Sequence, residues 1–111
     1  MEIATEHLES IVLIRIKGRC YSSEAQAVED GLAAALGGGA PHLAVDMTEL
    51  DYISSAGLRV LLKLAKQIHR GKGKVVLFGL RPNVREVFSI SAFDRIFSIY
   101  NDRAAAIAAI G

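Results

Sequence analysis

The amino-acid sequence predicts an α/β fold, a single domain with a mixed, mostly parallel sheet of about four to five strands and about four helices. Short apolar runs of strand length alternate with segments whose apolar residues recur at helical spacing, the pattern of β-α-β units. The first two strand-like runs follow each other with no helix between them. We therefore expect those two strands to pair antiparallel, which makes the sheet mixed.

The first elements are expected to be a strand pair and a helix. Residues 11–17 begin with an apolar run and then alternate, and residues 2–6 can pair with them across a tight turn. Residues 23–26 have the spacing of a capping box, so a helix should begin there and end at the three glycines 37–39. One face of this helix carries Ala25, Val28, Leu32, Ala35 and Leu36.

The rest of the chain repeats the strand–helix alternation. Residues 43–47 and 75–79 are nearly continuous apolar runs, as expected for strands that are buried on both faces. Between them lies the most amphipathic segment, a helix expected from about Ala56 to Arg70. The remaining expected elements are a helix opened by Pro82, a short strand at 96–100 and a final helix capped by Asn101.

Composition bounds the class of protein. The chain has 111 residues, 51% of them hydrophobic, so one globular domain over residues 1–111 is expected. A formal net charge of +1 favours neither nucleic acid nor a membrane surface as partner. The acidic N-terminus does not resemble a signal peptide, and the single cysteine allows no internal disulfide. We expect a cytoplasmic protein that is a monomer when free.

Two adjacent serines, Ser54 and Ser55, stand where a strand-like run at 50–53 meets the amphipathic helix. A hydroxyl at this position lies beside the unpaired backbone N–H groups and the positive dipole end of the helix. Such a hydroxyl can cap the helix, or it can carry a phosphate. The sequence leaves both interpretations open.

The amphipathic helix has two contrasting faces. Its apolar arc consists of Leu58, Leu61, Leu62, Leu64, Ala65 and Ile68. The opposite, basic arc consists of Arg59, Lys63, Lys66 and Arg70, with Val60 and Gln67 at its edge. The basic arc is either a solvated face or a surface that docks an acidic partner, in which case Ala56 and Val60 would pack at its centre.

Gly57 in the first turn of this helix is unusual, because glycine there costs about 0.5–1 kcal/mol relative to alanine. One explanation is close packing of the helix start on a neighbouring loop. The other is close approach of a partner's backbone to the serines. Neither is excluded by the sequence.

Catalysis and metal binding are not expected. The three histidines, at positions 7, 42 and 69, lie in separate elements, and no Gly-x-Ser-x-Gly elbow is present. Asp46 stands at a strand end, like a phosphoacceptor aspartate. However, residues 18–21 supply none of the further carboxylates that would hold a divalent ion. We expect no catalytic residues, no metal site and no cofactor.

Residues 46–62, DMTELDYISSAGLRVLL, resemble the signature of STAS domains, which are named for sulfate transporters and anti-sigma factor antagonists. The resemblance extends to the N-terminal strand pair, the turn at Gly18, residues 71–74 and residues 93–97. The length resembles that of a free-standing bacterial anti-sigma factor antagonist. In that family the phosphorylated serine lies two residues before the glycine, which implies Ser55 here. The family's preceding Asp is Ser54 in this chain, and its following Ser or Thr is Ala56.

The resemblance implies partner switching. The unphosphorylated protein would bind an anti-sigma factor that is also a serine kinase of the GHKL ATPase type. Phosphorylation of Ser55 would release that partner, and a PP2C-type serine phosphatase would reset the cycle. The residues implied at the partner surface are Ser54, Ala56, Gly57, Arg59, Val60 and Lys63. Two alternatives are a STAS scaffold subunit of a lipid-transport ABC complex and a STAS module that senses a small ligand.

Overall fold

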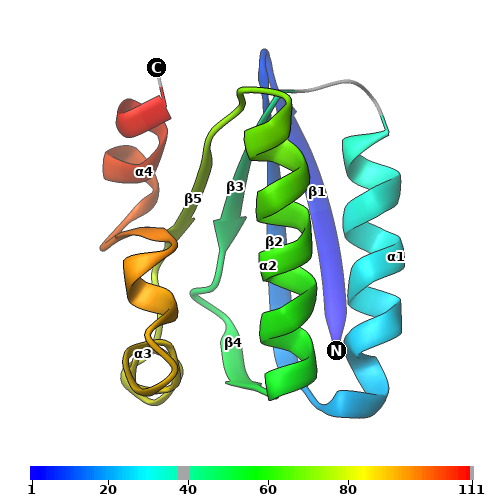
Figure 1. Cartoon of the computed structure of the whole chain (residues 1–111), viewed down its shortest axis with the longest axis vertical. Helices are drawn as coiled ribbons and strands as arrows, with labels where there is room; N and C mark the ends of the chain where they lie inside the picture. The colour runs from blue at the N-terminus through cyan, green and yellow to red at the C-terminus, as the bar shows by residue number, and fades with distance from the viewer. Residues whose placement is uncertain (38–40, 111) are drawn as a thin grey trace.

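The computed structural model describes residues 1–37 and 41–110, and within them the chain forms six β-strands and four α-helices (Figure 1). The strands are β1 (Glu2–Leu8), β2 (Ile11–Cys20), β3 (His42–Asp46), β4 (Leu50–Ile53), β5 (Val75–Phe78) and β6 (Ser98–Tyr100). The helices are α1 (Ala25–Leu36), α2 (Ser55–Arg70), α3 (Pro82–Ile90) and α4 (Arg103–Ile110). Of the glycines expected to end the first helix, Gly37 follows α1 directly, and Gly38 and Gly39 lie outside the described residues.

The strands form one mixed sheet in the order β1-β2-β3-β5-β6. β1 and β2 pair antiparallel, with Thr5 opposite Ile14, and the other pairings are parallel, so the predicted fold class is confirmed. β4 pairs with the far end of β2, beyond the part of β2 that pairs with β3. That pairing brings the strand leading into α2 next to the loop leading into α1 (Figure 1).

Alternation along the central strands supplies a core on each face of the sheet. On one face Val12, Ile14, Val45 and Leu77 pack with α1, α2 and α3. On the other face a smaller cluster packs beneath α4 and consists of Ile11, Leu13, Ala44, Val76, Phe78, Ala106 and Ile110. The apolar runs at β3 and β5 are therefore buried on both sides, as the sequence predicts.

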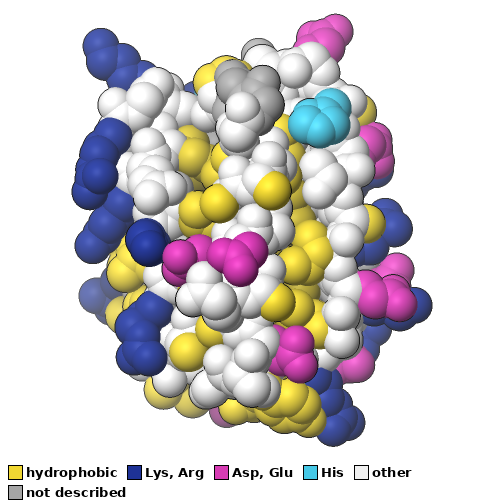
Figure 2. All heavy atoms as spheres, turned by 90° about the vertical axis from the view of Figure 1, so that its right-hand side faces the viewer, with side chains coloured by type: hydrophobic (Ala, Val, Ile, Leu, Met, Phe, Trp, Pro, Cys, Tyr) yellow, Lys and Arg dark blue, Asp and Glu magenta, His cyan; other side chains and the backbone are white. Residues whose placement is uncertain are grey.

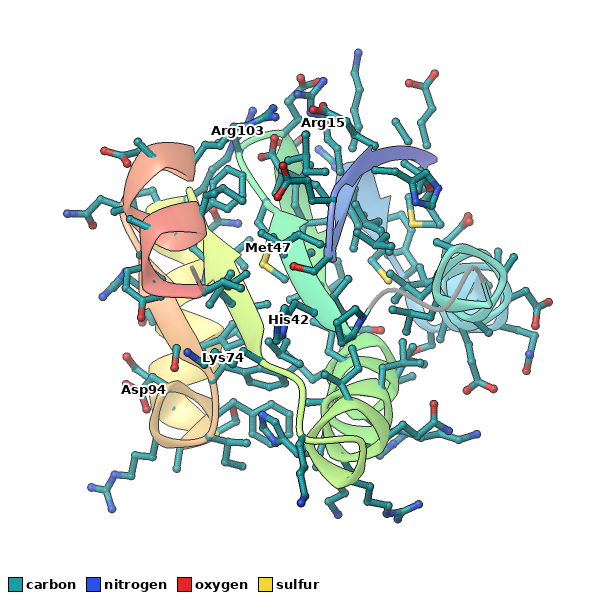
Figure 3. The ribbon with its side chains drawn as sticks, turned by 90° about the horizontal axis from the view of Figure 1, so that it is seen from above. Arg15, His42, Met47, Lys74, Asp94 and Arg103 are labelled. Carbon is teal, nitrogen blue, oxygen red and sulfur yellow. The ribbon has the colours of Figure 1, made fainter. Side chains whose placement is uncertain are left out.

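The face that carries α4 is closed by polar contacts at its margins. Arg103 Nη2 lies 2.6 Å from Glu6 Oε2, and Arg103 and Arg15 are both found at the same margin of the molecule when it is seen from above (Figure 3). The side-chain hydrogen bond from Arg103 lowers the pKa of Glu6. At the opposite end of β3, His42 Nδ1 accepts a 2.9 Å hydrogen bond from the Lys74 backbone N–H, which ties β3 to the start of β5.

Two predicted helix caps are wrong. Residues 22–24 form a 3-10 turn, so α1 begins at Ala25 without a side-chain cap, and the capping box does not form. At α4 the capping residue is Asp102 and not Asn101, because the Asp102 carboxylate accepts a 2.9 Å hydrogen bond from the Ala105 N–H. Spacing alone does not distinguish neighbouring residues that can both accept a hydrogen bond.

Asp46, at the end of β3, is a structural residue. Its side chain accepts hydrogen bonds from the Thr48 N–H (2.9 Å), the Thr48 hydroxyl (2.7 Å) and Arg15 Nε (3.0 Å). Burial raises the pKa of Asp46, but the bonds from Thr48 and Arg15 outweigh it, so the net pKa lies below the ordinary value. These bonds fix the turn between β3 and β4, and thereby the direction in which the chain enters α2.

Replacing Asp46 by Asn should lower the free energy of unfolding at pH 7 by about 1.5–3 kcal/mol, because hydrogen bonds to a charged group are lost. The folded-state pKa is depressed, so this stabilisation is fully present above the unfolded pKa of about 3.9 and is lost as pH falls through the folded pKa. Urea unfolding at pH 7 and at successively lower pH should show the gap between wild type and Asp46→Asn closing.

The matched control is Glu49→Gln, because Glu49 pairs with Lys17 at 3.6 Å in an exposed position. This variant should change the free energy of unfolding by no more than about 0.5 kcal/mol. A difference between wild type and Asp46→Asn that stays constant over the whole pH range would contradict the assignment.

Candidate functional site

The two serines at the start of α2 lie in different surroundings. Ser54 is extended, with φ −81° and ψ 166°, and its hydroxyl accepts a 3.2 Å hydrogen bond from the Gly57 N–H. It is only 6% exposed, and its own N–H donates to the Cys20 carbonyl at 2.9 Å. Ser54 is therefore the helix cap and also the link between α2 and the end of β2.

Ser55 is the first residue of α2 and is exposed to solvent. Because Ser54 already caps the helix, the Ser55 hydroxyl is not needed for that purpose. Of the two functions that the sequence left open, Ser54 performs the capping, and Ser55 is placed where an enzyme could reach its hydroxyl.

Gly57 is explained by packing inside the chain. A Cβ atom added to Gly57 would lie 2.9 Å from Cys20 Sγ and 2.9 Å from Ile53 Cγ1, closer than such atoms approach one another. The first turn of α2 thus rests directly on the ends of β2 and β4. This is the first of the two explanations given above, and it needs no partner.

The four basic residues predicted on the outward face of α2 are exposed there, but a residue predicted at the edge of that face is not. Arg59, Lys63, Lys66 and Arg70 are exposed, and Lys and Arg side chains line the α2 side of the molecule (Figure 2). Val60, expected at the edge of this arc, is instead buried at 7% exposure and belongs to the main core. Leu62, expected in the core, is only half-buried. A helical wheel assumes that a helix is buried on one side only. Helix α2 packs on the sheet and also on α1 beside it, so residues at the edge of the predicted apolar arc can be buried or exposed contrary to the wheel.

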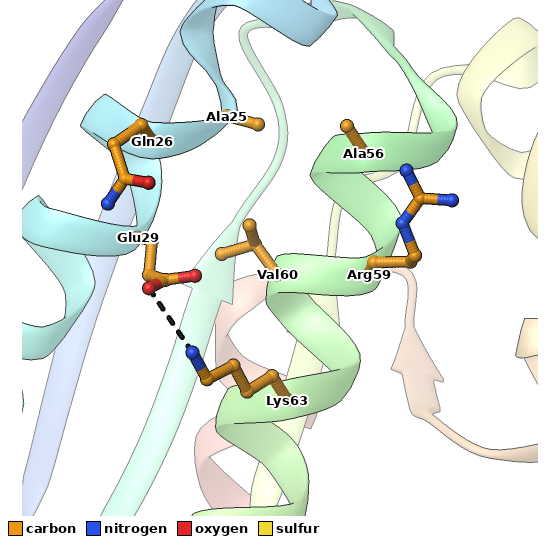
Figure 4. A pocket seen from close by; sticks show the side chains of 7 residues that line it. All are labelled: Ala25, Gln26, Glu29, Ala56, Arg59, Val60 and Lys63. Carbon is orange, nitrogen blue, oxygen red and sulfur yellow. Dashed lines mark hydrogen bonds and ion pairs between the residues drawn. The ribbon is translucent and has the colours of Figure 1, made fainter.

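A shallow groove of about 270 Å³ runs between α1 and α2 from the serine end (Figure 4). Its apolar lining is Ala25, Ala56 and Val60. Across it, Lys63 Nζ lies 3.3 Å from Glu29 Oε2, so this lysine is already paired within the chain. Arg59 also lines the groove, and in Figure 4 its side chain extends toward the first turn of α2.

The structure also contains an aromatic pair that the sequence did not predict, formed by Tyr21, directly after β2, and Tyr52 in β4. The rings of Tyr21 and Tyr52 lie with centroids 5.4 Å apart, and both side chains are exposed, at 46% and 42%. Arg19 donates a 3.1 Å hydrogen bond to the Tyr21 hydroxyl and pairs with Tyr52 across β2 and β4. The strand character of residues 50–53 is the signal that could have predicted this pair. A strand there needs a pairing partner, and pairing with the end of β2 places Tyr52 near Tyr21.

The thiol nearest the two serines is that of Cys20, which is buried. Burial, and then the nearby charge of Glu24, raise the pKa of the Cys20 thiol, which keeps it protonated at neutral pH. Within residues 1–37 and 41–110 no group of three or more His, Cys, Asp or Glu side chains converges as metal ligands would. In the same residues, every helix is too short or too polar to cross a bilayer.

The fold and the serine-bearing helix start define a STAS domain, and the STAS domain family model matches residues 2–106. This chain belongs to the STAS domain family. It is 42% identical to BtrV of Bordetella bronchiseptica, a proposed anti-sigma factor antagonist, over 98% of this chain and 94% of the relative.

Solved structures at lower identity share the fold. An anti-sigma factor antagonist from Mycobacterium paratuberculosis superposes with a TM-score of 0.89 at 19% identity, over 98% of this chain and 92% of the other. SpoIIAA, a Bacillus cell fate determinant, superposes in its phosphorylated form with a TM-score of 0.74 at 19% identity, over 99% of this chain and 100% of the other.

Replacing Gly57 by Ala should destabilise the protein by about 1–3 kcal/mol, although alanine is the better helix former by about 1 kcal/mol. The new methyl group would overlap Cys20 Sγ and Ile53 Cγ1. Chemical unfolding would measure the loss. In a Cys20→Ala background, where the sulfur is absent, the cost of Gly57→Ala should be smaller. Equal costs in the two backgrounds would refute the packing explanation.

Proposed function

We propose that this chain is an anti-sigma factor antagonist that works by partner switching in the cytoplasm, as a binding module and not as an enzyme. The unphosphorylated form binds an anti-sigma factor that is also a serine kinase of the GHKL ATPase type. That kinase phosphorylates Ser55, the complex dissociates, and a PP2C-type phosphatase restores the original form. The observation that carries the proposal is the exposed Ser55 at the first position of α2, directly after a serine that already caps the helix.

The electrostatics of this position suit a switch. A phosphate adds about −1.5 to −2 charges at neutral pH. In the free protein that charge stands at the positive end of the α2 dipole, where a negative group is favourable by about 0.3–1 kcal/mol. Inside a packed interface the same charge must be desolvated and would weaken binding, and each 1.4 kcal/mol corresponds to a tenfold change in affinity. Phosphorylation would therefore act on the complex more than on the fold.

The surface around Ser55 has the composition of a protein-binding site. The exposed Tyr21–Tyr52 pair and the exposed Arg59 are the residue types that dominate binding energy at interfaces. Ala56 lines the groove next to Ser55. Lys63 is already paired with Glu29, and Val60 is buried, so we assign Arg59 the larger share of docking among the basic-arc residues.

Ser55, and not Ser54, should be the phosphoacceptor. Incubation with ATP and the kinase isolated from the source organism should label wild type and Ser54→Ala and leave Ser55→Ala unlabelled. Ser54→Ala loses the cap and should be destabilised by about 1 kcal/mol, so its folding is to be checked by circular dichroism. Label on Ser55→Ala, located by mass spectrometry, would show that another residue is the acceptor.

Arg59 should steer the encounter with the kinase. Arg59→Glu should slow association in stopped-flow measurements, and the effect should shrink at high salt, because charges at an interface rim act through a screened field. Arg70→Glu makes the same change of charge at the far end of the same helix and should have a smaller effect. Equal, negligible effects of the two reversals would mean that this face of α2 is only solvated. Val60→Ala would test packing between α1 and α2 instead of docking, since Val60 is buried.

A further inference from the structure

Of the first four backbone N–H groups of α2, two are already bound within the chain, which leaves those of Ser55 and Ala56. The Gly57 N–H is already bound by the Ser54 hydroxyl at 3.2 Å, and the Leu58 N–H is bound by the Ser54 carbonyl at 3.0 Å. Ser54 is also neutral, so it neither repels nor attracts the added charge. The N–H groups of Ser55 and Ala56 and the helix dipole balance part of the charge of a phosphate at this position, and a side-chain cation would balance more of it, because hydrogen bonds between charged groups are the stronger ones.

Arg59 is placed to be that cation. It follows Ser55 by one helical turn on the exposed side of α2, and residues four apart on a helix are neighbours about 5–6 Å apart at their Cβ atoms. Side chains on a helix lean toward its N-terminus, so Arg59 extends over the turn that carries Ser55, as Figure 4 shows.

Arg59 is also not engaged elsewhere in the part of the chain that the structure describes. The ion pairs found among residues 1–37 and 41–110 involve other cations, namely Arg15, Lys17, Lys63, Arg81 and Arg103. The acidic side chain that lines the same groove, Glu29, lies 3.3 Å from the Lys63 ammonium. No carboxylate in this groove therefore holds the Arg59 guanidinium back.

We propose that Arg59 binds the phosphate of phosphorylated Ser55 within the same chain, and that this pairing withdraws the guanidinium from the surface that docks the kinase. The inference rests on the proposed function, because it takes Ser55 as the phosphoacceptor. A planar guanidinium presents two parallel N–H donors that match two phosphate oxygens, whereas a lysine ammonium acts as a point charge. Phosphorylation would then have two effects, the addition of a negative charge and the sequestration of a positive one that the partner uses.

The test uses protein in which phosphoserine is inserted at position 55 during translation, so that no kinase is needed. A ³¹P NMR titration gives the second pKa of the phosphate, which is about 6 for an unperturbed phosphoserine. Because a nearby cation favours the dianion, wild type should titrate below this value, and Arg59→Gln should raise the pKa by about 0.5. The NMR chemical shift of the Arg59 Nε–H should also differ between the unphosphorylated and the phosphorylated wild-type protein. This second measurement requires no substitution of Arg59.

Two further variants sharpen the outcome. Arg59→Lys keeps the charge but loses the bidentate geometry and should titrate between wild type and Arg59→Gln. Arg70→Gln removes the same group at the other end of α2 and should titrate like wild type. The inference is overturned if Arg59→Gln leaves the phosphate pKa unchanged, if Arg70→Gln shifts it equally, or if the Arg59 resonance does not move.

Failure of this inference and failure of the proposed function give different results. If the kinase labels Ser55 but Arg59→Gln does not alter the titration, only the role of Arg59 is wrong. If the kinase labels a different residue, the proposed function is wrong, and the titration of the inserted phosphoserine still decides whether Arg59 binds a phosphate there.

Discussion

The contact between the end of β2 and the first turn of α2 determines the shape of the proposed site. The Ser54 N–H binds the Cys20 carbonyl, and Gly57 has no side chain, which lets the helix rest on the Cys20 sulfur. With Ser54 turned inward as the cap, the next residue has to face solvent. The accessibility of Ser55 is thus a consequence of backbone hydrogen bonding at the residue before it and of close packing two residues after it.

The same segment is held at its other end by a buried carboxylate. Asp46 binds both donors of Thr48 and also Arg15, so the turn between β3 and β4 is tied to β2. Farther along, the backbone carbonyl of Asp51 accepts a 2.6 Å hydrogen bond from the Asn83 amide at the start of α3. The stretch between Asp46 and Gly57 is therefore anchored from both faces of the sheet, and Ser55 would be presented to a partner on a rigid surface.

The sequence predicted most of the fold because its signals are periodic. The apolar runs of β3 and β5 and the amphipathic pattern of α2 each specify burial, and the structure has those elements within a few residues of the expected bounds. What could not be predicted depends on contacts between segments distant in the chain. Val60 is buried because α1 lies beside α2, and Tyr21 meets Tyr52 because β4 pairs with the end of β2. No pattern within either segment contains that information.

At the site, residue types and order placed both serines correctly at the helix start, but their roles depended on backbone geometry. The extended conformation of Ser54 makes it the cap, and a shift of one residue would make Ser55 the cap and leave Ser54 outside the helix. Likewise, the sequence could not choose between a packing and a binding reason for Gly57, since both require only a missing side chain. The position of Cys20 directly beneath Gly57 shows that packing is the reason.

The buried thiol at this contact also gives access to the motions of the site. Cys20 is 1% exposed and lies under the first turn of α2, so a thiol-modifying reagent can reach it only after that turn has separated from β2. Its rate of alkylation under native conditions is then proportional to the population of the locally opened state. The protein thus carries, at its single cysteine, a natural reporter of how often the helix that bears Ser55 detaches from the sheet.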